Sequence, residues 1–213
     1  MLDKNEEMFA SHQYFVSSIY TAKNESFLDT VREVSNEALL SAPENLDEIY
    51  PMRNTDNYAL DKRLAAFCEF IGTRCWSILS SQGYAMEQYQ VVIESMWTQE
   101  HYKYSLMEQH THGNNAQLVG FYFLDVPEGS SKAIFHDPRA GKVQIDLFER
   151  DVTIATQASK AVNFAPEPGL FLISNSWQPH SFSRHTSDKP LKFVHFNICV
   201  ANVQKEAMPV EVV

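Results

Sequence analysis

The sequence predicts a mainly β protein, with N-terminal helices packed against a jelly-roll core. Helical periodicity of apolar residues is confined to the first 87 positions. From about Gln88 onward, short segments rich in β-forming residues follow one another. Turn-forming residues separate these segments at short intervals, a spacing typical of a sandwich or jelly roll and not of alternating βα units.

The length and composition favour one globular domain. A chain of 213 residues can bury one substantial core, and its apolar content of 44% and charged content of 21% are ordinary for a folded protein. We expect a single domain over 1–213, with 1–87 as helical support, 88–200 as the β core and 201–213 as a C-terminal tail.

Two helices are predicted in the N-terminal part. The first is capped by Ser26, carries apolar residues at helical spacing, and ends before Pro43. The second begins near Asn57 and ends at Gly83, since glycine readily closes a helix. The segment between them, 43–55, is predicted to be a loop.

Eight strands are predicted in the C-terminal part. The turn sequences Pro-Glu-Gly-Ser at 127–130, Asp-Pro-Arg-Ala-Gly at 137–141 and Pro-Glu-Pro-Gly at 166–169 separate some of them. The predicted strands cover about 89–98, 117–126, 132–135, 143–148, 160–164, 169–174, 180–184 and 191–200.

The charge balance argues against a nucleic-acid partner. The chain has 27 acidic and 17 basic residues, a formal net charge of −10. Phosphate contacts need a basic surface, which no stripe of lysine or arginine supplies. The N-terminus lacks the features of a signal peptide and no apolar run approaches eighteen residues, so we expect no membrane span.

The cysteines favour a reducing compartment. Cys68 and Cys75 are seven apart on a predicted helix, about 10 Å along its axis, which is too far for a disulfide. With Cys199 the count is odd, as is usual in the cytosol. We therefore expect a cytoplasmic protein. The aromatic residues of the β half leave a homodimer open as an alternative to a simple core.

Histidines carry the main chemical signal. His110 and His112 form a His-x-His pair, and side chains at i and i+2 of a strand share one face. His180, seventy residues past His110, could complete a metal site, and Asp137 could add a carboxylate from the end of another strand. Histidine and carboxylate ligands with open positions are typical of non-haem Fe(II).

Each of these residues also has an ordinary structural explanation. The pair could be two strand histidines facing solvent, His180 a structural residue of a turn, and Asp137 the opening residue of an Asp-Pro turn. The weaker candidates are His101, His136, His185 and His195. Of these, His195 is expected to point into the barrel as support for a ligand.

The ordered motifs of residues 110–198 resemble the 2-oxoglutarate/Fe(II)-dependent oxygenases of bacteria and their phages, whose relatives include prolyl hydroxylases. Several motifs in the same order make the resemblance fairly specific. They are His-x-His at 110–112, Gly-Phe-Tyr-Phe at 120–123, Pro-Glu-Gly at 127–129, Asp-Pro-Arg at 137–139, Ser-Trp-x-x-His at 176–180 and Phe-Asn-Ile at 196–198.

The resemblance implies a double-stranded β-helix that holds Fe(II), with 2-oxoglutarate and O2 as co-substrates. Two departures matter. The usual ligand pattern of the relatives is His-x-Asp…His, and His112 occupies the Asp place, so the third ligand is open between His112 and Asp137. The family's co-substrate arginine falls on Leu191, with Lys192 one step away, where a bulge near Pro190 could let it serve.

The candidates for binding 2-oxoglutarate are therefore Lys192, Arg184, Arg139 and the phenol of Tyr122. The predicted function is hydroxylation of a protein side chain or small molecule, with prolyl-hydroxylase-like activity first. One alternative is a cupin-like metalloprotein with an all-histidine site that does not use 2-oxoglutarate. The other is a non-catalytic jelly-roll binding or structural module.

Overall fold

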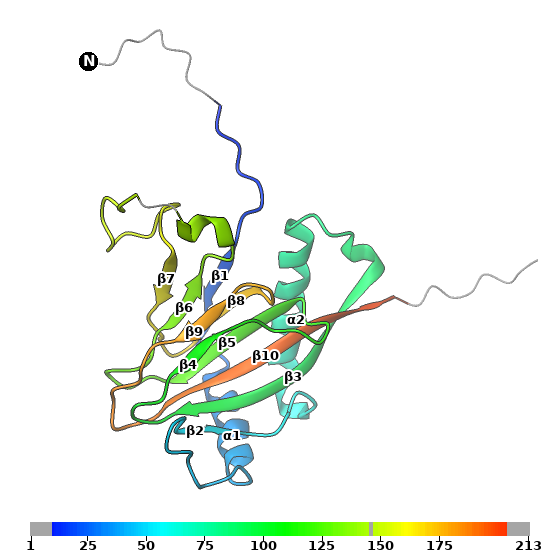
Figure 1. The fold of residues 1–213 in the computed structure, drawn as a ribbon. Coiled ribbons are helices and arrows are strands. Elements are labelled where there is room, and N and C mark those ends of the chain that lie inside the picture. Colours follow the sequence, from blue (N-terminus) through cyan, green and yellow to red (C-terminus); the bar gives the residue numbers. More distant parts are fainter. Residues whose placement is uncertain (1–9, 145–146, 204–213) are drawn as a thin grey trace, which may run out of the picture.

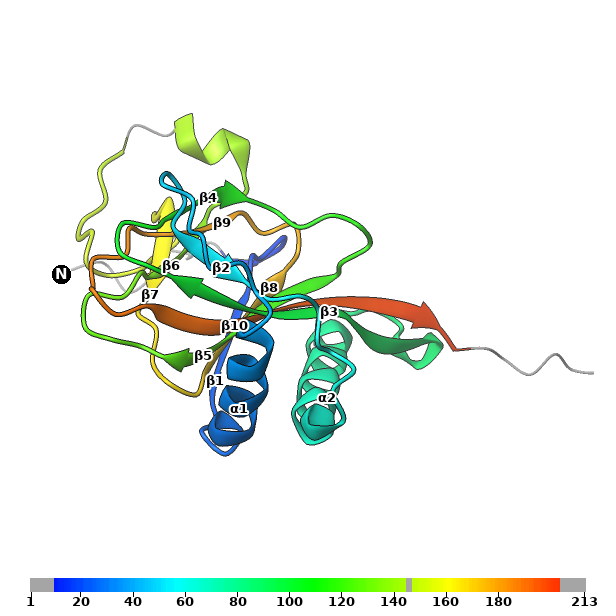
Figure 2. The ribbon, with the colours of Figure 1, turned by 90° about the horizontal axis from the view of Figure 1, so that it is seen from below.

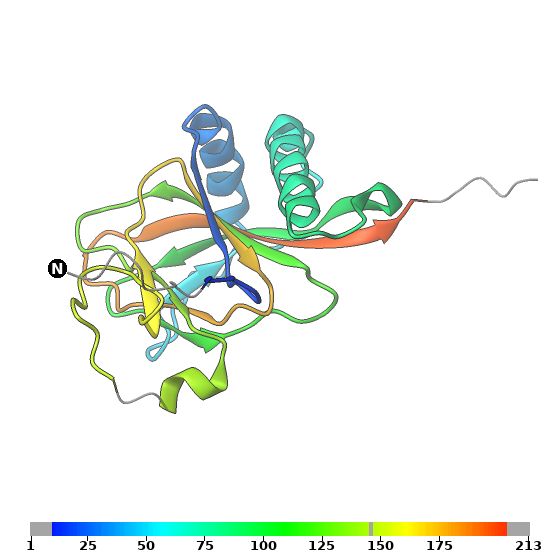
Figure 3. The ribbon, with the colours of Figure 1, turned by 90° about the horizontal axis from the view of Figure 1, so that it is seen from above.

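The computed structural model describes residues 10–144 and 147–203. Two antiparallel sheets face each other, and two helices cover the outer face of the larger sheet (Figure 1). The views from below and above show both helices on the same side of that sheet, with the smaller sheet on the other side (Figure 2 and Figure 3). The described chain is thus three layers deep, which agrees with the predicted jelly roll.

The helices are α1 (Leu28–Leu39) and α2 (Ala65–Ser81). The larger sheet contains β1 (Ile19–Lys23), β8 (Leu170–Asn175), β5 (Leu118–Asp125), β10 (Leu191–Asn202), β3 (Tyr89–His101) and β2 (Met52–Asn54), in that order. The smaller sheet contains β4 (Met107–His110), β9 (His180–Phe182), β6 (Ala133–His136) and β7 (Ala161–Phe164), in that order. Short 3-10 helices cover Lys62–Leu64, Met86–Gln88 and Ala140–Gln144.

The central strands of the larger sheet are apolar on both faces because each face is covered. One core lies between this sheet and the helices and includes Phe67, Tyr122 and Phe196. A second core lies between the two sheets and includes Phe121, Phe182 and Phe193. Alternate residues of β5 and β10 therefore enter different cores. Gly120 leaves room for the Phe196 ring, which a Cβ at that position would overlap.

The helices start later than the sequence suggested. Ser26 does not cap α1; its backbone N–H and hydroxyl both donate to the Asn24 side chain, and Phe27 stands at the N-cap without a side-chain hydrogen bond. The second helix begins at Ala65 after a 3-10 turn, where the prediction had placed its start near Asn57. Its end was predicted well, since Gly83 follows with a positive φ of 96°.

Seven of the eight predicted strands are present, and three further strands were missed. The prediction over 143–148 is wrong in the part that is described, because the 3-10 helix Ala140–Gln144 occupies its start; residues 145 and 146 lie outside the described residues. The missed strands are β1, β2 and β4. β1 and β2 lie within the segment assigned to helical support, so that segment also adds an edge strand to each side of the larger sheet.

Other expectations concern the cysteines and the membrane. Cys68, Cys75 and Cys199 are all free thiols, which agrees with the prediction that Cys68 and Cys75 are too far apart for a disulfide. Among the helices of the described residues, none has the length and apolar character needed to cross a membrane. The tail predicted over 201–213 starts inside β10, and residues 204–213 lie outside the described part of the chain.

Candidate metal centre

Three histidines that are distant in sequence meet at the smaller sheet. His110 on β4 and His180 on β9 are direct partners across two antiparallel strands. His112 follows β4, and its backbone N–H donates to the carbonyl of Ser176 at 2.9 Å, which holds it beside the turn that leads into β9. One ligand atom from each of the three lies within 4.8 Å of the others. An ion bound at about 2.0–2.1 Å from each nitrogen would draw them closer still.

Backbone carbonyls orient two of these rings. Nδ1 of His110 lies 2.8 Å from the carbonyl oxygen of Glu108, and Nδ1 of His180 lies 3.1 Å from that of Gln178. A carbonyl oxygen can only accept, so Nδ1 carries the proton in both rings. The lone pair of Nε2 is then free to bind a metal, the arrangement found in most metal-ligating histidines.

Burial keeps His112 and His180 in the form that binds metals. Burial lowers the pKa of His180 to about 3, and it also lowers the pKa of His112. Both rings are therefore neutral at pH 7, the protonation state that a metal ligand needs. Nε2 of each is buried without a hydrogen-bond partner. An unpaired buried polar atom is costly in free energy, which is the expected signature of a ligand position.

His195 lies next to this group, inside the barrel as predicted. Its ring is 5.0 Å from that of His112, 4.6 Å from Phe121 and 4.2 Å from Trp97, measured between centroids. The other three weaker candidates lie elsewhere around the core. His101 packs in T-shaped contact against the stacked rings of Phe182 and Phe193, while His136 and His185 bond to Ser181 and Lys189.

The structure does not bring Asp137 into the histidine group. Its carboxylate accepts from Arg139 at 2.8–2.9 Å and from Lys142 at 3.3 Å. These hydrogen bonds hold the pKa of Asp137 well below its usual range, and those from Arg139 contribute most. β4 and β6 are both antiparallel to β9 and so run parallel to each other. The side chain at the end of β6 nevertheless finds other partners.

The four residues predicted to bind 2-oxoglutarate also lie apart from the histidines. Lys192 points toward the helices, where its ammonium group is 2.8 Å from Asn36 on α1 and 3.4 Å from Glu100. Arg184 is exposed, and Arg139 pairs with Asp137. Tyr122 belongs to the core between the helices and the larger sheet, where its hydroxyl donates to the carbonyl of Asn24. The phenol of Tyr122 therefore lies on the other side of the larger sheet from the histidines.

Comparison with known proteins identifies the domain. Residues 95–197 match the model of the family described as "Putative 2OG-Fe(II) oxygenase". The chain carries a 2OG-Fe(II) oxygenase domain. The matched range contains all three clustered histidines and the strands that hold them. No curated protein matches this sequence.

Solved structures of such oxygenases share the fold of this oxygenase domain. A prolyl-4-hydroxylase from Pseudomonas putida has a TM-score of 0.55 at 9% identity, over 85% of this chain and 92% of that one. HygX from Streptomyces hygroscopicus, with nickel and 2-oxoglutarate bound, has a TM-score of 0.51 at 10% identity, over 86% and 83%. A Trichoplax adhaerens prolyl hydroxylase in complex with a hypoxia inducible factor peptide fragment has a TM-score of 0.54 at 9% identity, over 85% and 83%.

The oxygenase uses Fe(II) and 2-oxoglutarate, and the clustered histidines fit the metal. For the metal, the fit rests on three converging imidazoles, two of them with buried and unpaired Nε2 atoms. None of the four residues predicted to bind 2-oxoglutarate is among the groups that shift the pKa values of His180 and His195. Beyond burial and a hydrogen bond to a backbone carbonyl, the groups that shift the pKa values of His180 and His195 are all histidines.

A pair of variants separates the two candidates for the third ligand. We expect Asp137→Asn to keep its affinity for Fe(II) within about twofold, since the carboxylate is already engaged by Arg139 and Lys142. His112→Ala should lower the Fe(II) affinity at least about 100-fold. That is the upper end of the loss expected when a residue that only supports a ligand is removed. Anaerobic titration calorimetry with Fe(II) measures both. The reverse order of effects would assign the ligand role to Asp137.

Proposed function

We propose that this oxygenase hydroxylates a C–H bond of a protein side chain or a small molecule, with a prolyl side chain as the first candidate, and that His110, His112 and His180 hold the Fe(II). The observation that carries the proposal is the convergence of these three imidazoles at one point of a 2OG-Fe(II) oxygenase domain. The named activity of two similar structures, prolyl hydroxylation, supports the choice of substrate.

When bound, Fe(II) and 2-oxoglutarate supply the oxidising chemistry, in which O2 gives one oxygen atom to succinate and one to the hydroxylated substrate as CO2 leaves. The chain itself orients the ligands. The carbonyls of Glu108 and Gln178 fix the proton on Nδ1 of His110 and His180. Phe121 and Phe135 lie 5.5 and 6.0 Å from the His180 ring between centroids, and they exclude water from that side.

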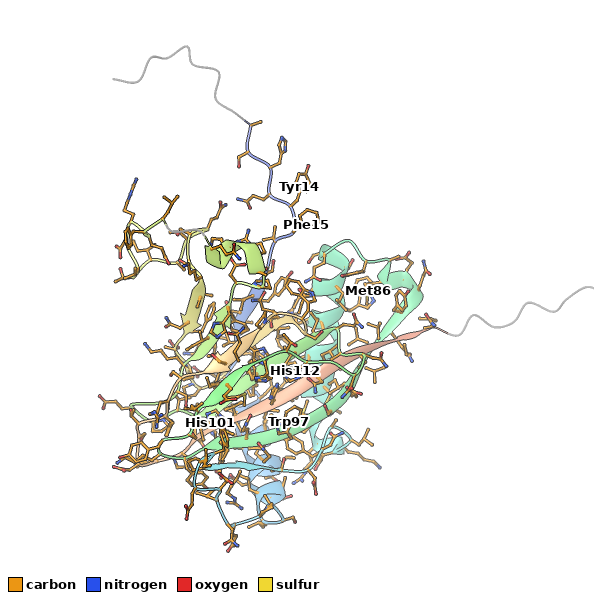
Figure 4. All side chains as sticks on the ribbon, viewed as in Figure 1. Tyr14, Phe15, Met86, Trp97, His101 and His112 are labelled. Carbon is orange, nitrogen blue, oxygen red and sulfur yellow. The ribbon has the colours of Figure 1, made fainter. Side chains whose placement is uncertain are left out.

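A cavity lined by Phe135, whose ring also lies next to His180, is the candidate substrate site. It has a volume of about 410 Å³ and is lined by Phe135, Gln178, Asp137 and the N-terminal segment 11–17. Phe135 connects the cavity with the metal centre, since the same ring faces His180. Tyr14 and Phe15 of the N-terminal segment, labelled in Figure 4, line this cavity and are otherwise exposed. Its lining is mixed, with polar side chains such as Gln178 and Asp137 beside the ring of Phe135, and its size suits a single side chain or a small molecule.

The test is a coupled assay with the anaerobically reconstituted Fe(II) protein. We expect 2-oxoglutarate and O2 to give succinate, and a proline-containing peptide to accelerate succinate formation while gaining the mass of one oxygen atom. Mass spectrometry of the peptide and chromatography of succinate measure the two products. Succinate formation without any peptide modification would support the oxygenase but reject the prolyl substrate. No succinate from the iron-loaded protein would contradict the proposed function itself.

A further inference from the structure

A groove on the helix side of the larger sheet plays no part in the metal centre. It has a volume of about 330 Å³ and lies between α2 and the edge formed by β1 and β8. The helix lines it with one stripe of side chains, which extends about 16 Å along the helix axis. These side chains belong to Phe70, Ile71, Arg74, Ser77, Ile78 and Ser81.

The walls of this groove are apolar over most of its length. Phe70 of the helix and Phe171 of β8 lie side by side, with 5.3 Å between their ring centroids. Ile78 and Ile173 continue the apolar surface. The hydroxyls of the two serines on the helix donate to carbonyls of the same helix, so they are already engaged. A molecule that occupies the groove therefore gains mainly by burying apolar groups.

One positive charge lies in the lining. The guanidinium group of Arg74 is 5.3 Å from the centroid of the Phe70 ring, on the same face of the helix. The lining contains no acidic residue. Arg63, which precedes the same helix, is paired with three carboxylates, whereas Arg74 forms no ion pair in the described part of the chain. The groove thus combines apolar walls with one cation that is free to bind an anion.

We propose that this groove binds an amphiphilic carboxylate, such as a medium-chain fatty acid, with the carboxylate at Arg74 and the alkyl chain along the phenylalanine and isoleucine side chains. The planar guanidinium group matches a carboxylate in shape and charge. Each buried methylene group strengthens binding about fourfold. The volume falls within the range of small-molecule sites, about 300–1,000 Å³. The site is independent of the proposed function, because the larger sheet separates it from the histidines.

The experiment compares two probes of equal chain length and opposite charge. Decanoate and decylamine are titrated calorimetrically into the iron-loaded protein under anaerobic conditions, below the concentrations at which they form micelles. General attraction would favour the amine, since the chain has a formal net charge of −10. We nevertheless expect decanoate to bind at least about fivefold more tightly. Arg74→Gln should remove this preference, while the control Lys62→Gln, at an exposed residue outside the groove, should keep it.

Methyl NMR of isoleucine-labelled protein locates the bound probe. Decanoate should shift the methyl resonances of Ile78 and Ile173, which line the groove, and leave that of Ile134 on the smaller sheet unchanged. Ala22 is an exposed residue of β1 that also lines the groove. Ala22→Phe should fill the space and weaken decanoate binding at least about tenfold, without disturbing a buried position.

Several results would overturn the proposal. They are the absence of decanoate binding, equal affinity for the acid and the amine, and shifts confined to Ile134. Binding that is lost in His180→Ala would place the carboxylate at the metal centre and would also reject the groove. Shifts of Ile78 and Ile173 that depend on protein concentration, without any probe, would assign the groove to a second copy of the chain. Retained decanoate binding in His180→Ala supports the site even if the proposed function fails.

Discussion

Replacing His180 with alanine is expected to abolish succinate formation and to lower Fe(II) affinity by more than about 100-fold. Removing a residue that only supports a metal ligand already lowers metal affinity about 10- to 100-fold. His180 is buried, neutral and fixed by the carbonyl of Gln178, so its Nε2 is the best prepared of the three donor atoms. With alanine at position 180, only the nitrogens of His110 and His112 remain to bind the metal. Metal analysis after gel filtration and anaerobic calorimetry measure the loss.

A histidine from the adjoining strand supplies the control for this experiment. His136 on β6 hydrogen-bonds to Ser181 and lies outside the group of three ligand atoms. His136→Ala removes the same side chain from the same sheet, yet it should leave Fe(II) affinity within about twofold. Equal iron retention by His180→Ala and His136→Ala would mean that the histidines do not form the metal centre. Circular dichroism of both variants separates a lost ligand from a lost fold.

The long strands could be predicted because their own residues and the turns beside them favour β structure. β3, β5, β8 and β10 are rich in β-branched and aromatic residues, and turn sequences bound β5 and β8. β1 and β2 could not be predicted in the same way. They are edge strands of five and three residues, and their only support is pairing with β8 and β3, which are remote in sequence. Such pairing is a tertiary effect that a local pattern does not contain.

The face of Lys192 could have been predicted from His195. Side chains alternate along a strand, so residues three apart point to opposite sides, and both cannot face the metal centre. The bulge invoked near Pro190 does not rescue the assignment. β10 pairs with β3 without interruption from Leu191 to Asn197, and the register shift near Lys192 occurs against β5, where Leu124 is the extra residue. The irregularity therefore leaves the direction of Lys192 unchanged.

Tyr122 and Asp137 show where sequence reasoning lacks information. Every residue of β5 from Leu118 to Leu124 is buried, because helices cover one face of the strand and the smaller sheet covers the other. A continuous apolar run does not indicate which side chains face the helices and which face the smaller sheet. Asp137 was placed correctly at a strand end, but its engagement by Lys142 depends on the 3-10 helix Ala140–Gln144, which the sequence did not predict. The three histidines were found because spacing and a family pattern agreed.

Phe67 offers the largest expected effect on stability without touching the metal centre. It is buried on α2, and its ring lies 5.5 Å from Phe27, 5.0 Å from Tyr122 and 5.8 Å from Phe171. Phe67→Ala should lower the free energy of unfolding by about 3–5 kcal/mol through lost burial and a residual cavity. A domain is typically stable by only about 5–15 kcal/mol, so this loss is a large part of the total. Urea denaturation measures it.

The position of Phe67 makes this experiment a test of the layered fold as well as of packing. Glu69, two residues along the same helix, is exposed, and Glu69→Ala should change the unfolding free energy by no more than about 0.5 kcal/mol. The larger sheet separates Phe67 from the histidines, which lie on its other side. Phe67→Ala should therefore bind Fe(II) as tightly as the wild-type protein at temperatures where it remains folded. Loss of metal affinity in the folded variant would show that the helix layer shapes the metal centre, contrary to this division of the molecule.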